Sequence, residues 1–343
     1  MQEELIIGGT VIKAGERKQV YLDTAKLYDF TEMSIPIEVV RGKEDGPVLF
    51  VSAAVHGDEI NGVEIIRRLL TKKAIKNIKG TLITIPIVNV FGFNTKSRYL
   101  PDRRDLNRNF PGSEKGSLTA QLAYTFMTEI VEKCTHGIDL HCAAVNRVNL
   151  PQIRACLDDK NTKAMAHAFN VPVVLHSALR DGSLRAAARD LKIPMLLFEG
   201  GEALRFNEKT IKSGLNGVLS VMREIGMLKP LKNKSVLHDV FTARSSHWVR
   251  APHSGILSVK VNLGERVKKS KVLGIISDPF GQEKHEIIAR RTGIVIGMAT
   301  LPLLNRGEAA FHVATFEDSN AVEEHVDIFE EQLDSGNGDR FLN

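Results

Sequence analysis

Apolar positions follow two alternating spacings over residues 47–226. Short runs of apolar and β-branched residues predict buried strands at 48–55, 81–90, 137–140, 153–157, 173–175 and 195–198. Between these runs, apolar residues recur at helical spacing and predict helices at 62–70, 118–131, 161–169, 183–191 and 207–225. This alternation predicts an α/β fold in which a mixed, mostly parallel sheet is flanked by helices. Ligands of such folds gather at the carboxyl ends of the strands.

The pattern changes after Pro230, where short runs of Val, Ile and Leu are separated by glycines and no helix is expected before residue 320. The sequence APHSGIL at 251–257 is echoed by ARRTGIV at 289–295, and two copies of a strand–turn unit predict a small pseudo-symmetric β-domain. We therefore predict a larger domain at 1–235, with a β-rich lead-in over 1–45, and an all-β domain at 236–343 that ends in an acidic tail.

The smaller domain resembles the barrel-sandwich fold of biotinyl and lipoyl domains. Those carriers present a modified lysine on the turn between their halves, usually within Met-Lys-Met or Asp-Lys. The corresponding stretch here, SDPFGQEK at 277–284, departs from both patterns. A structural or active-site-covering role is therefore favoured over carriage of a group.

Composition indicates a globular protein, which we expect in the cytoplasm. Apolar residues make up 43% and charged residues 25% of the chain, and three cysteines without framework spacing argue against a disulfide-stapled secreted domain. No apolar run is long enough to cross a bilayer, and the first residues carry acids where a secretion signal needs bases. The net charge is +5, but the bases form no stripe interleaved with aromatics, so no specific nucleic-acid binding is expected.

The most informative motif is VHGDE at 55–59, directly after the first predicted strand. His56 and Glu59 stand three residues apart in the strand-to-helix turn, a spacing that lets an imidazole and a carboxylate converge on one ion. Catalytic zinc takes three protein ligands and leaves one position for water, and His141, at the end of the strand at 137–140, is the candidate for the third. His136 is disfavoured because it lies an odd number of residues from His141 and points to the other face of the strand.

Glu199 follows the apolar strand at 195–198, where a carboxylate is costly to bury without a partner. A metal-bound water would be such a partner, with Glu199 as the general base. The alternative is a carboxylate that caps the next helix or pairs with an arginine. The loop at 98–112 offers several guanidiniums and amides suited to a carboxylate ligand or an oxyanion. Its alternative role is a basic surface loop, partly neutralised by Asp102 and Asp105.

Structural roles are expected for most other polar candidates. We expect Cys142 to be buried and inert, because adjacent strand residues point to opposite faces. Packing or surface positions are favoured for His167 and His176. A further group at the start of the second domain could face the active site as a lid, but packing is favoured; it consists of His238, His247, Trp248 and His253.

Together, the HGDE motif after a strand, DLNR at 105–108, a strand-end histidine and a strand-end glutamate resemble the succinylglutamate desuccinylase/aspartoacylase family. The resemblance covers about residues 47–226 and implies the zinc carboxypeptidase fold. It implies one zinc ion per chain held by His56, Glu59 and His141, and Glu199 as the base that activates water. It also implies that Asn107 and Arg108 bind substrate.

The same resemblance implies an arginine, from an Arg-Tyr pair, that polarises the scissile carbonyl. Arg98-Tyr99 fits that pair but lies two residues further upstream of the DLNR motif than in aspartoacylases, so Arg103 and Arg104 stay alternatives to Arg98.

The activity implied is zinc-dependent cleavage of the amide bond of an N-acyl amino acid or a similar small carboxylate-bearing amide. The alternatives are a zinc carboxypeptidase acting on peptides and a non-catalytic relative that binds a small ligand. A homo-oligomer is compatible with the sequence. We expect the β-domain to narrow the mouth of the active site.

Overall fold

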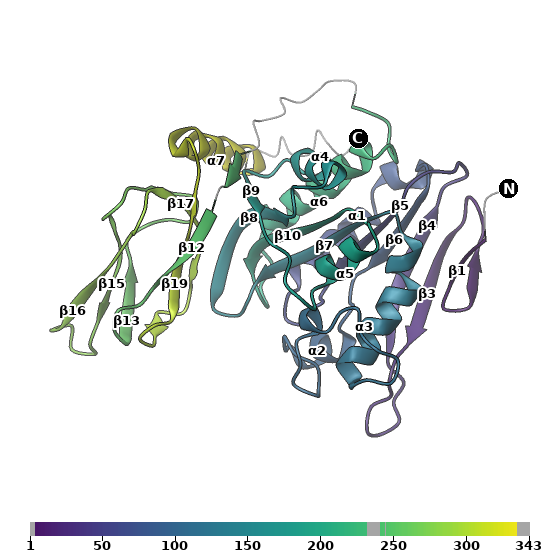
Figure 1. Ribbon diagram of the computed structural model, residues 1–343, viewed down its shortest axis with the longest axis horizontal. Helices are drawn as coiled ribbons and strands as arrows, with labels where there is room; N and C mark the ends of the chain where they lie inside the picture. The colour runs from purple at the N-terminus through teal and green to yellow at the C-terminus, as the bar shows by residue number, and fades with distance from the viewer. Residues whose placement is uncertain (1–3, 232–240, 244, 335–343) are drawn as a thin grey trace.

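The computed structural model describes residues 4–231, 241–243 and 245–334 (Figure 1). Within these residues a 13-stranded mixed sheet runs through most of the molecule, accompanied by a four-stranded sheet and a two-stranded hairpin. The predicted α/β fold with a β-rich C-terminal part is confirmed. The predicted boundary at 235/236 and His238 lie outside the described residues.

Four parallel strands form the centre of the large sheet, in the order β6-β5-β7-β10. They are β5 (Val48–Ala53), β6 (Thr81–Ile85), β7 (His136–Ala143) and β10 (Met195–Glu202). They are largely buried because helices cover both of their faces. Since the strands are parallel, their carboxyl ends meet at one edge of the sheet.

Antiparallel strands extend this centre on both sides. At one side β4 pairs with β6 and β3 with β4, and at the other β8 pairs antiparallel with β10 and parallel with β9, which pairs with β11. The bounds are β3 (Arg17–Asp23), β4 (Ser34–Arg41), β8 (Arg147–Ala155), β9 (Val173–His176) and β11 (Phe241–Ala243), with the separate hairpin β1 (Leu5–Ile7) and β2 (Thr10–Ile12). Among the strands that the structure describes, parallel pairing is therefore confined to the centre and to β8-β9-β11.

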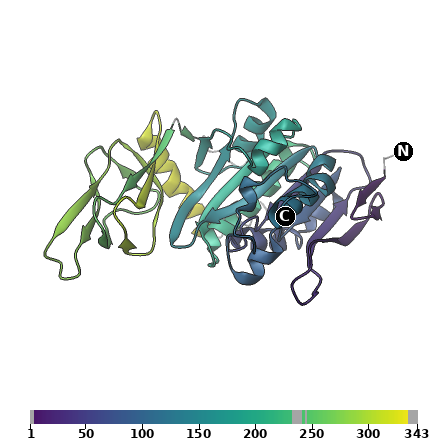
Figure 2. The ribbon, with the colours of Figure 1, turned by 60° about the horizontal axis from the view of Figure 1, so that its bottom comes forward.

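Two layers of helices cover the central strands (Figures 1 and 2). One layer is α1 (Asn61–Leu69), α4 (Lys160–Ala168) and α6 (Glu208–Glu224), and the other is α2 (Val90–Thr95), α3 (Leu118–Glu129) and α5 (Leu184–Asp190). Residues of β5 alternate between them, because Leu49 and Val51 pack with the first layer and Phe50 with the second. Short 3-10 helices lie at Lys73–Asn77, Leu106–Arg108 and Val131–Lys133.

Several predicted strands differ from the structure in extent: β7 and β10 are eight residues long where four were predicted, and β5 ends at Ala53 rather than at residue 55. The strand predicted at 81–90 ends at Ile85, because Asn89 caps α2 by accepting a hydrogen bond from Gly92 N. The strand predicted at 153–157 overlaps only the last three residues of β8, which begins six residues earlier, at Arg147, and ends at Ala155. The first part of β8 was not predicted because its polar residues interrupt the apolar pattern.

The C-terminal part is a β-sandwich followed by a helix. The sheet β16-β15-β13-β18 packs against β12, β17 and β19 around a core that includes Leu257, Leu273 and Phe311. The elements are β12 (Ser245–Arg250), β13 (Gly255–Val259), β14 (Arg266–Val267), β15 (Val272–Ser277), β16 (Lys284–Ile288), β17 (Gly293–Ala299), β18 (Leu303–Leu304), β19 (Ala309–Thr315) and α7 (Ser319–Asp334). The two copies of the repeat lead into β13 and β17.

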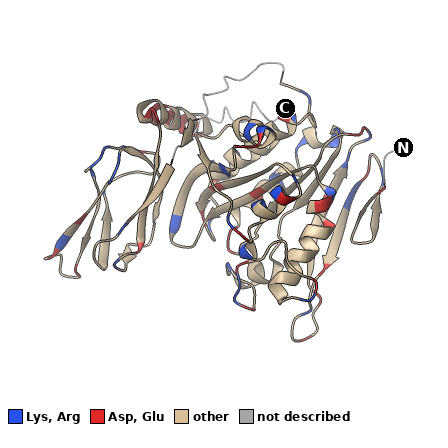
Figure 3. Ribbon diagram, in the orientation of Figure 1, with Lys and Arg blue, Asp and Glu red and all other residues tan. Residues whose placement is uncertain are grey.

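The sandwich continues the large sheet, because β17 pairs with β8 (Figure 2). Helix α7 carries much of the predicted acidic tail (Figure 3) and contacts α6, where Lys209 Nζ lies 3.0 Å from carboxylate oxygens of Glu330 and Asp334. None of the helices in the described part of the chain combines the length and apolar character needed to cross a membrane.

Candidate metal centre and active site

A tight turn after β5 brings His56 and Glu59 together. Glu59 N donates to His56 O at 3.1 Å. Gly57 lets this turn pack against the backbone of α2, since a Cβ at that position would lie 2.0 Å from the carbonyl carbon of Gly92. Both functional side chains are almost fully buried, with 3% of His56 and 2% of Glu59 exposed.

His141 of β7 completes the group. Its Nδ1 lies 2.7 Å from Glu59 Oε2, and His56 Nδ1 lies 2.7 Å from Glu59 Oε1. One ligand atom from each of the three residues lies within 4.8 Å of the others, so this buried group could bind a metal ion. His136 stands apart, with its Nδ1 2.8 Å from Thr135 Oγ1.

Two aspartates bind the other ring nitrogens of these histidines. Asp139 Oδ2 lies 2.7 Å from His141 Nε2, and Asp105 Oδ1 lies 3.0 Å from His56 Nε2. Carboxylates in these positions fix the tautomer that leaves the Nδ1 lone pair for a metal. Burial opposes the ionised form of Glu59, but both histidines outweigh burial and lower its pKa. The same ion pairs raise the pKa of both histidines. A metal that displaced the Nδ1 protons would meet two imidazole nitrogens and an ionised carboxylate as its donor set.

Arg98, and neither Arg103 nor Arg104, reaches this group. Its Nη1 lies 3.2 Å from Glu59 Oε1 and its Nη2 2.9 Å from Asp105 Oδ2. Burial disfavours the charge of Arg98, but these two carboxylates outweigh burial and raise its pKa. Arg103 and Arg104 are exposed and lie outside the pocket lining.

Asn107 and Arg108 lie on a 3-10 helix that borders the same pocket. Asp105 begins this helix by accepting a hydrogen bond from Asn107 N at 2.8 Å. The amide oxygen of Asn107 accepts from Leu184 N at 2.9 Å, which fixes the orientation of the side chain. Burial and the neighbouring Arg180 lower the pKa of Arg108.

Glu199 of β10 is the register partner of His141 on β7. Asn149 Nδ2 donates to Glu199 Oε2 at 2.8 Å, and Arg154 Nε lies 3.8 Å from Glu199 Oε1. An arginine does approach Glu199, as the alternative to a catalytic role requires, but at 3.8 Å it makes no direct hydrogen bond. The carboxylate remains part of the pocket lining.

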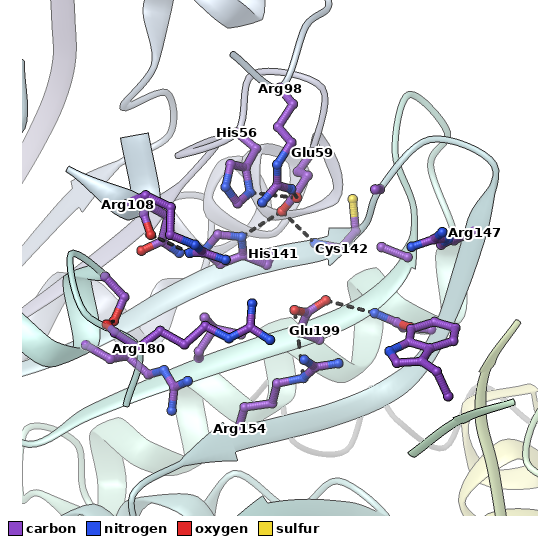
Figure 4. A pocket seen from close by; sticks show the side chains of 18 residues that line it. His56, Glu59, Arg98, Arg108, His141, Cys142, Arg147, Arg154, Arg180 and Glu199 are labelled. Carbon is purple, nitrogen blue, oxygen red and sulfur yellow. Dashed lines mark hydrogen bonds and ion pairs between the residues drawn. The ribbon is translucent and has the colours of Figure 1, made fainter. Parts of the chain in front are cut away.

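One pocket gathers all the residues predicted for metal, catalysis and substrate (Figure 4). Other side chains in its lining were not predicted from the sequence, namely Asn149, Arg147, Arg154, Arg180 and Arg185. Burial and the nearby Arg154 lower the pKa of Arg185 to about 10, and its Nε has no hydrogen-bond partner among the described residues. No motif marks these side chains; an excess of bases in the sequence was the only signal for the four arginines, and none pointed to Asn149.

Of the remaining polar and aromatic candidates, some line the pocket and others lie outside it. Cys142 is buried, as expected, but it lines the same pocket as His141 and so does not lie away from the site; its backbone N donates to Glu59 Oε2 at 3.1 Å. Trp248 lines the pocket, whereas His247 and His253 do not. The β-sandwich therefore contributes a side chain to the site. His167 and His176 lie outside the pocket lining.

Comparisons with known proteins point to one family. Residues 45–225 match the family model described as the succinylglutamate desuccinylase/aspartoacylase catalytic domain. The chain is 26% identical over 304 residues to the N-alpha-acetyl-L-2,4-diaminobutyric acid deacetylase of Halomonas elongata, which covers 83% of this chain and 86% of the relative.

Solved structures share the fold. The succinylglutamate desuccinylase/aspartoacylase from Rhodobacter sphaeroides is 25% identical, with a TM-score of 0.79 over 88% of this chain and 95% of that one. The product-bound ectoine utilization protein EutE from Ruegeria pomeroyi is 24% identical, with a TM-score of 0.79 over 87% and 95% of the two chains.

Proposed function

The chain belongs to the succinylglutamate desuccinylase/aspartoacylase family, and we propose that it is a zinc-dependent deacylase that hydrolyses the amide bond of a small N-acyl amino acid. The observation that carries this proposal is the meeting of the buried His56–Glu59–His141 group with Glu199 in one arginine-rich pocket. The deacetylase from Halomonas elongata supports the amide-cleaving class. All three cysteines are free, which agrees with the cytoplasmic location that we predict.

His56, Glu59 and His141 are the residues that would bind zinc. Two imidazole nitrogens and a carboxylate are a donor set of catalytic zinc, which keeps its fourth position for water. A zinc ion in such a site acts as a Lewis acid and lowers the pKa of water towards about 7. Asp105 and Asp139 keep the two imidazoles in the tautomer and orientation that binding requires.

Glu199 moves the proton in this mechanism. Its carboxylate accepts a proton from the attacking water and then donates it to the leaving nitrogen. Asn149 binds Oε2 of Glu199, which leaves Oε1 as the oxygen that takes the proton.

The substrate is held by side chains beside this reaction centre. Asn107 and Arg108 bind the carboxylate of the amino acid, for which a planar guanidinium is well suited. Arg98, which reaches the ligand group, stabilises the oxyanion that forms when water attacks the carbonyl carbon.

Metal content and turnover test this proposal together. We expect about one zinc per chain by elemental analysis, retained in Glu199→Gln and lost in His56→Ala. Because removal of a general base costs about 100-fold or more, Glu199→Gln should release amine from N-acyl amino acids at least about 100-fold more slowly.

Three results would contradict the proposal. Loss of zinc from Glu199→Gln would make Glu199 a ligand or a structural residue. A wild-type protein that binds no zinc even after reconstitution would favour the non-catalytic alternative, and turnover of peptides in preference to N-acyl amino acids would favour the carboxypeptidase alternative.

A further inference from the structure

The pocket contains more positive than negative side chains. Arg98 pairs with Glu59 and Asp105, and Arg154 lies near Glu199. Within the described chain, by contrast, no carboxylate pairs with Arg147, which lines the same pocket. A guanidinium that borders a pocket without a counter-ion is suited to an anion on the ligand.

An aromatic ring, rather than an acid, positions Arg147. Its guanidinium carbon lies 5.3 Å from the centre of the Trp248 ring, within the range of a cation–π interaction. Such an interaction uses the face of the guanidinium and leaves its N–H groups in the plane free to donate. The first residue of β8 thus presents unused donors at the pocket.

Trp248 is in turn supported by the β-sandwich. Its ring stacks on that of His312, with centroids 4.5 Å apart and an angle of 9° between the planes. Burial, together with Arg154 and His247, lowers the pKa of His312 to about 3, so this support is a neutral ring at physiological pH. Because Trp248 and His312 are register partners on neighbouring strands, the stack is fixed by the sheet.

The position of Arg147 assigns it to one end of the substrate. Figure 4 shows Arg108 and Arg147 on opposite sides of Glu199. If Asn107 and Arg108 bind the carboxylate of the amino acid, the acyl group extends past Glu199 in the other direction, towards Arg147. The lining there includes Cys142, Ala143 and Ala144, whose small side chains leave room for a short acyl chain.

We propose that Arg147, held by Trp248, determines acyl specificity by binding a carboxylate on the acyl group. This inference rests on the proposed deacylase function and narrows it. The preferred substrates are then N-acyl amino acids whose acyl group is a dicarboxylic acid joined through one carboxyl, rather than acetyl derivatives.

Matched substrates and variants test this inference. Wild-type protein, Arg147→Gln and Arg147→Lys would be assayed with N-acetyl and N-succinyl derivatives of the same amino acids. We expect the succinyl series to be preferred by the wild type. A bidentate pair of charged groups is worth roughly tenfold to hundredfold in binding, so Arg147→Gln should raise KM for the succinyl series by about that factor and leave the acetyl series unchanged. Arg147→Lys keeps the charge but lacks the planar guanidinium, so its KM for the succinyl series should lie between those of the wild type and Arg147→Gln.

A matched control and a binding assay separate specificity from general damage. The control is Arg180→Gln, because Arg180 lies on the same side of the pocket as Arg108 in Figure 4. This variant should raise KM for the acetyl and the succinyl series alike. Trp248 is the only tryptophan of the chain, so succinate binding to Glu199→Gln protein should change its fluorescence, and this change should disappear when Arg147→Gln is added.

The outcomes distinguish failure of the inference from failure of the proposed function. Efficient turnover of acetyl substrates with no effect of Arg147→Gln would overturn the inference and leave the deacylase standing. Equal losses for both series would also overturn it, since Arg147 would then be structural. Absence of zinc and of turnover in either series would overturn the proposed function itself.

Discussion

Asn149, which belongs to no recognisable motif, sets the position of the proposed base. It donates to Glu199 Oε2 at 2.8 Å, and its side chain is enclosed, with 6% of the residue exposed. Gly297 faces it from β17, and a Cβ at that glycine would lie 2.6 Å from Asn149 Oδ1. Asn149 is therefore confined between the carboxylate and the backbone of a neighbouring strand, as a positioning residue requires.

We predict that Asn149→Ala lowers kcat roughly tenfold to hundredfold with a smaller change in KM, because a hydrogen bond to a charged group contributes about 1.5–3 kcal/mol. Asn149→Asp should lower kcat further, since it places a like charge beside Glu199. Steady-state kinetics on an N-acyl amino acid, with zinc content measured in parallel, would check this. An alanine variant with unchanged kcat, or one that loses zinc, would show that Asn149 does not act through Glu199.

Motif residues of the site could be predicted from the sequence, whereas their neighbours could not. His56 and Glu59 lie on one turn, so their spacing alone determines that they converge. Glu199 and His141 each follow an apolar run in the carboxyl-terminal half of a strand, and the parallel arrangement places these halves at one edge of the sheet. Asn149 and Arg147 reach the pocket only because β8 pairs with β10, and no local pattern specifies which strands pair.

At the scale of elements, one row of residues links the base to the C-terminal sandwich. Asn149 of β8, Gly297 of β17, His312 of β19 and Trp248 of β12 are successive register partners across four strands. Cross-strand neighbours of this kind are the contacts through which a sheet is stabilised. A change at His312 is therefore expected to affect the junction between the two parts of the sheet.

The buried histidine of this row makes stability depend on pH. The pKa of His312 is lowered to about 3 in the folded protein, against about 6.5 for an unfolded histidine. Since the unfolded chain binds this proton more readily, stability is full above about pH 6.5 and is lost as the pH falls towards 3. The loss between about pH 6.5 and pH 5 should reach about 2 kcal/mol, at about 1.4 kcal/mol per pH unit.

His312→Phe keeps a ring against Trp248 but does not titrate, so its unfolding free energy should fall less over this range than that of the wild type. Urea unfolding at about pH 7 and pH 5 would measure the difference. Equal losses in the two proteins would mean that other groups govern the acid sensitivity.

Strands that are buried on both faces could be located from the sequence, whereas a strand with one polar face was located only in part. The central strands are covered by helices on both faces and read as apolar runs, so their positions follow from composition. Strand β8 begins with Arg147 and contains Asn149 and Gln152, because these side chains face the pocket or the neighbouring strand β17. Polar residues that serve the pocket thus make the strand that carries them harder to predict from the sequence.

At the scale of the whole molecule, the sequence predicts two domains, while one sheet passes through both. The change of pattern after Pro230 correctly indicates a β-rich part with two copies of a strand–turn unit. What the pattern cannot show is that β17 pairs with β8 across some 150 residues of chain, through Gly297 and Asn149. Because of this pairing, the sandwich forms part of the pocket wall.

The continuous sheet predicts a single unfolding transition. Separation of the sandwich would leave an edge of β8 unpaired and would break the ion pairs between α7 and Lys209 of α6. Fluorescence of Trp248, the only tryptophan, reports on the junction, whereas far-UV circular dichroism reports on all elements. We expect urea midpoints from the two probes to coincide, as cooperative unfolding requires. An earlier fluorescence transition would instead mean that the sandwich detaches first. The pocket would then lose Trp248 while the metal ligands stayed folded, and acyl specificity would be lost at urea concentrations that spare zinc binding.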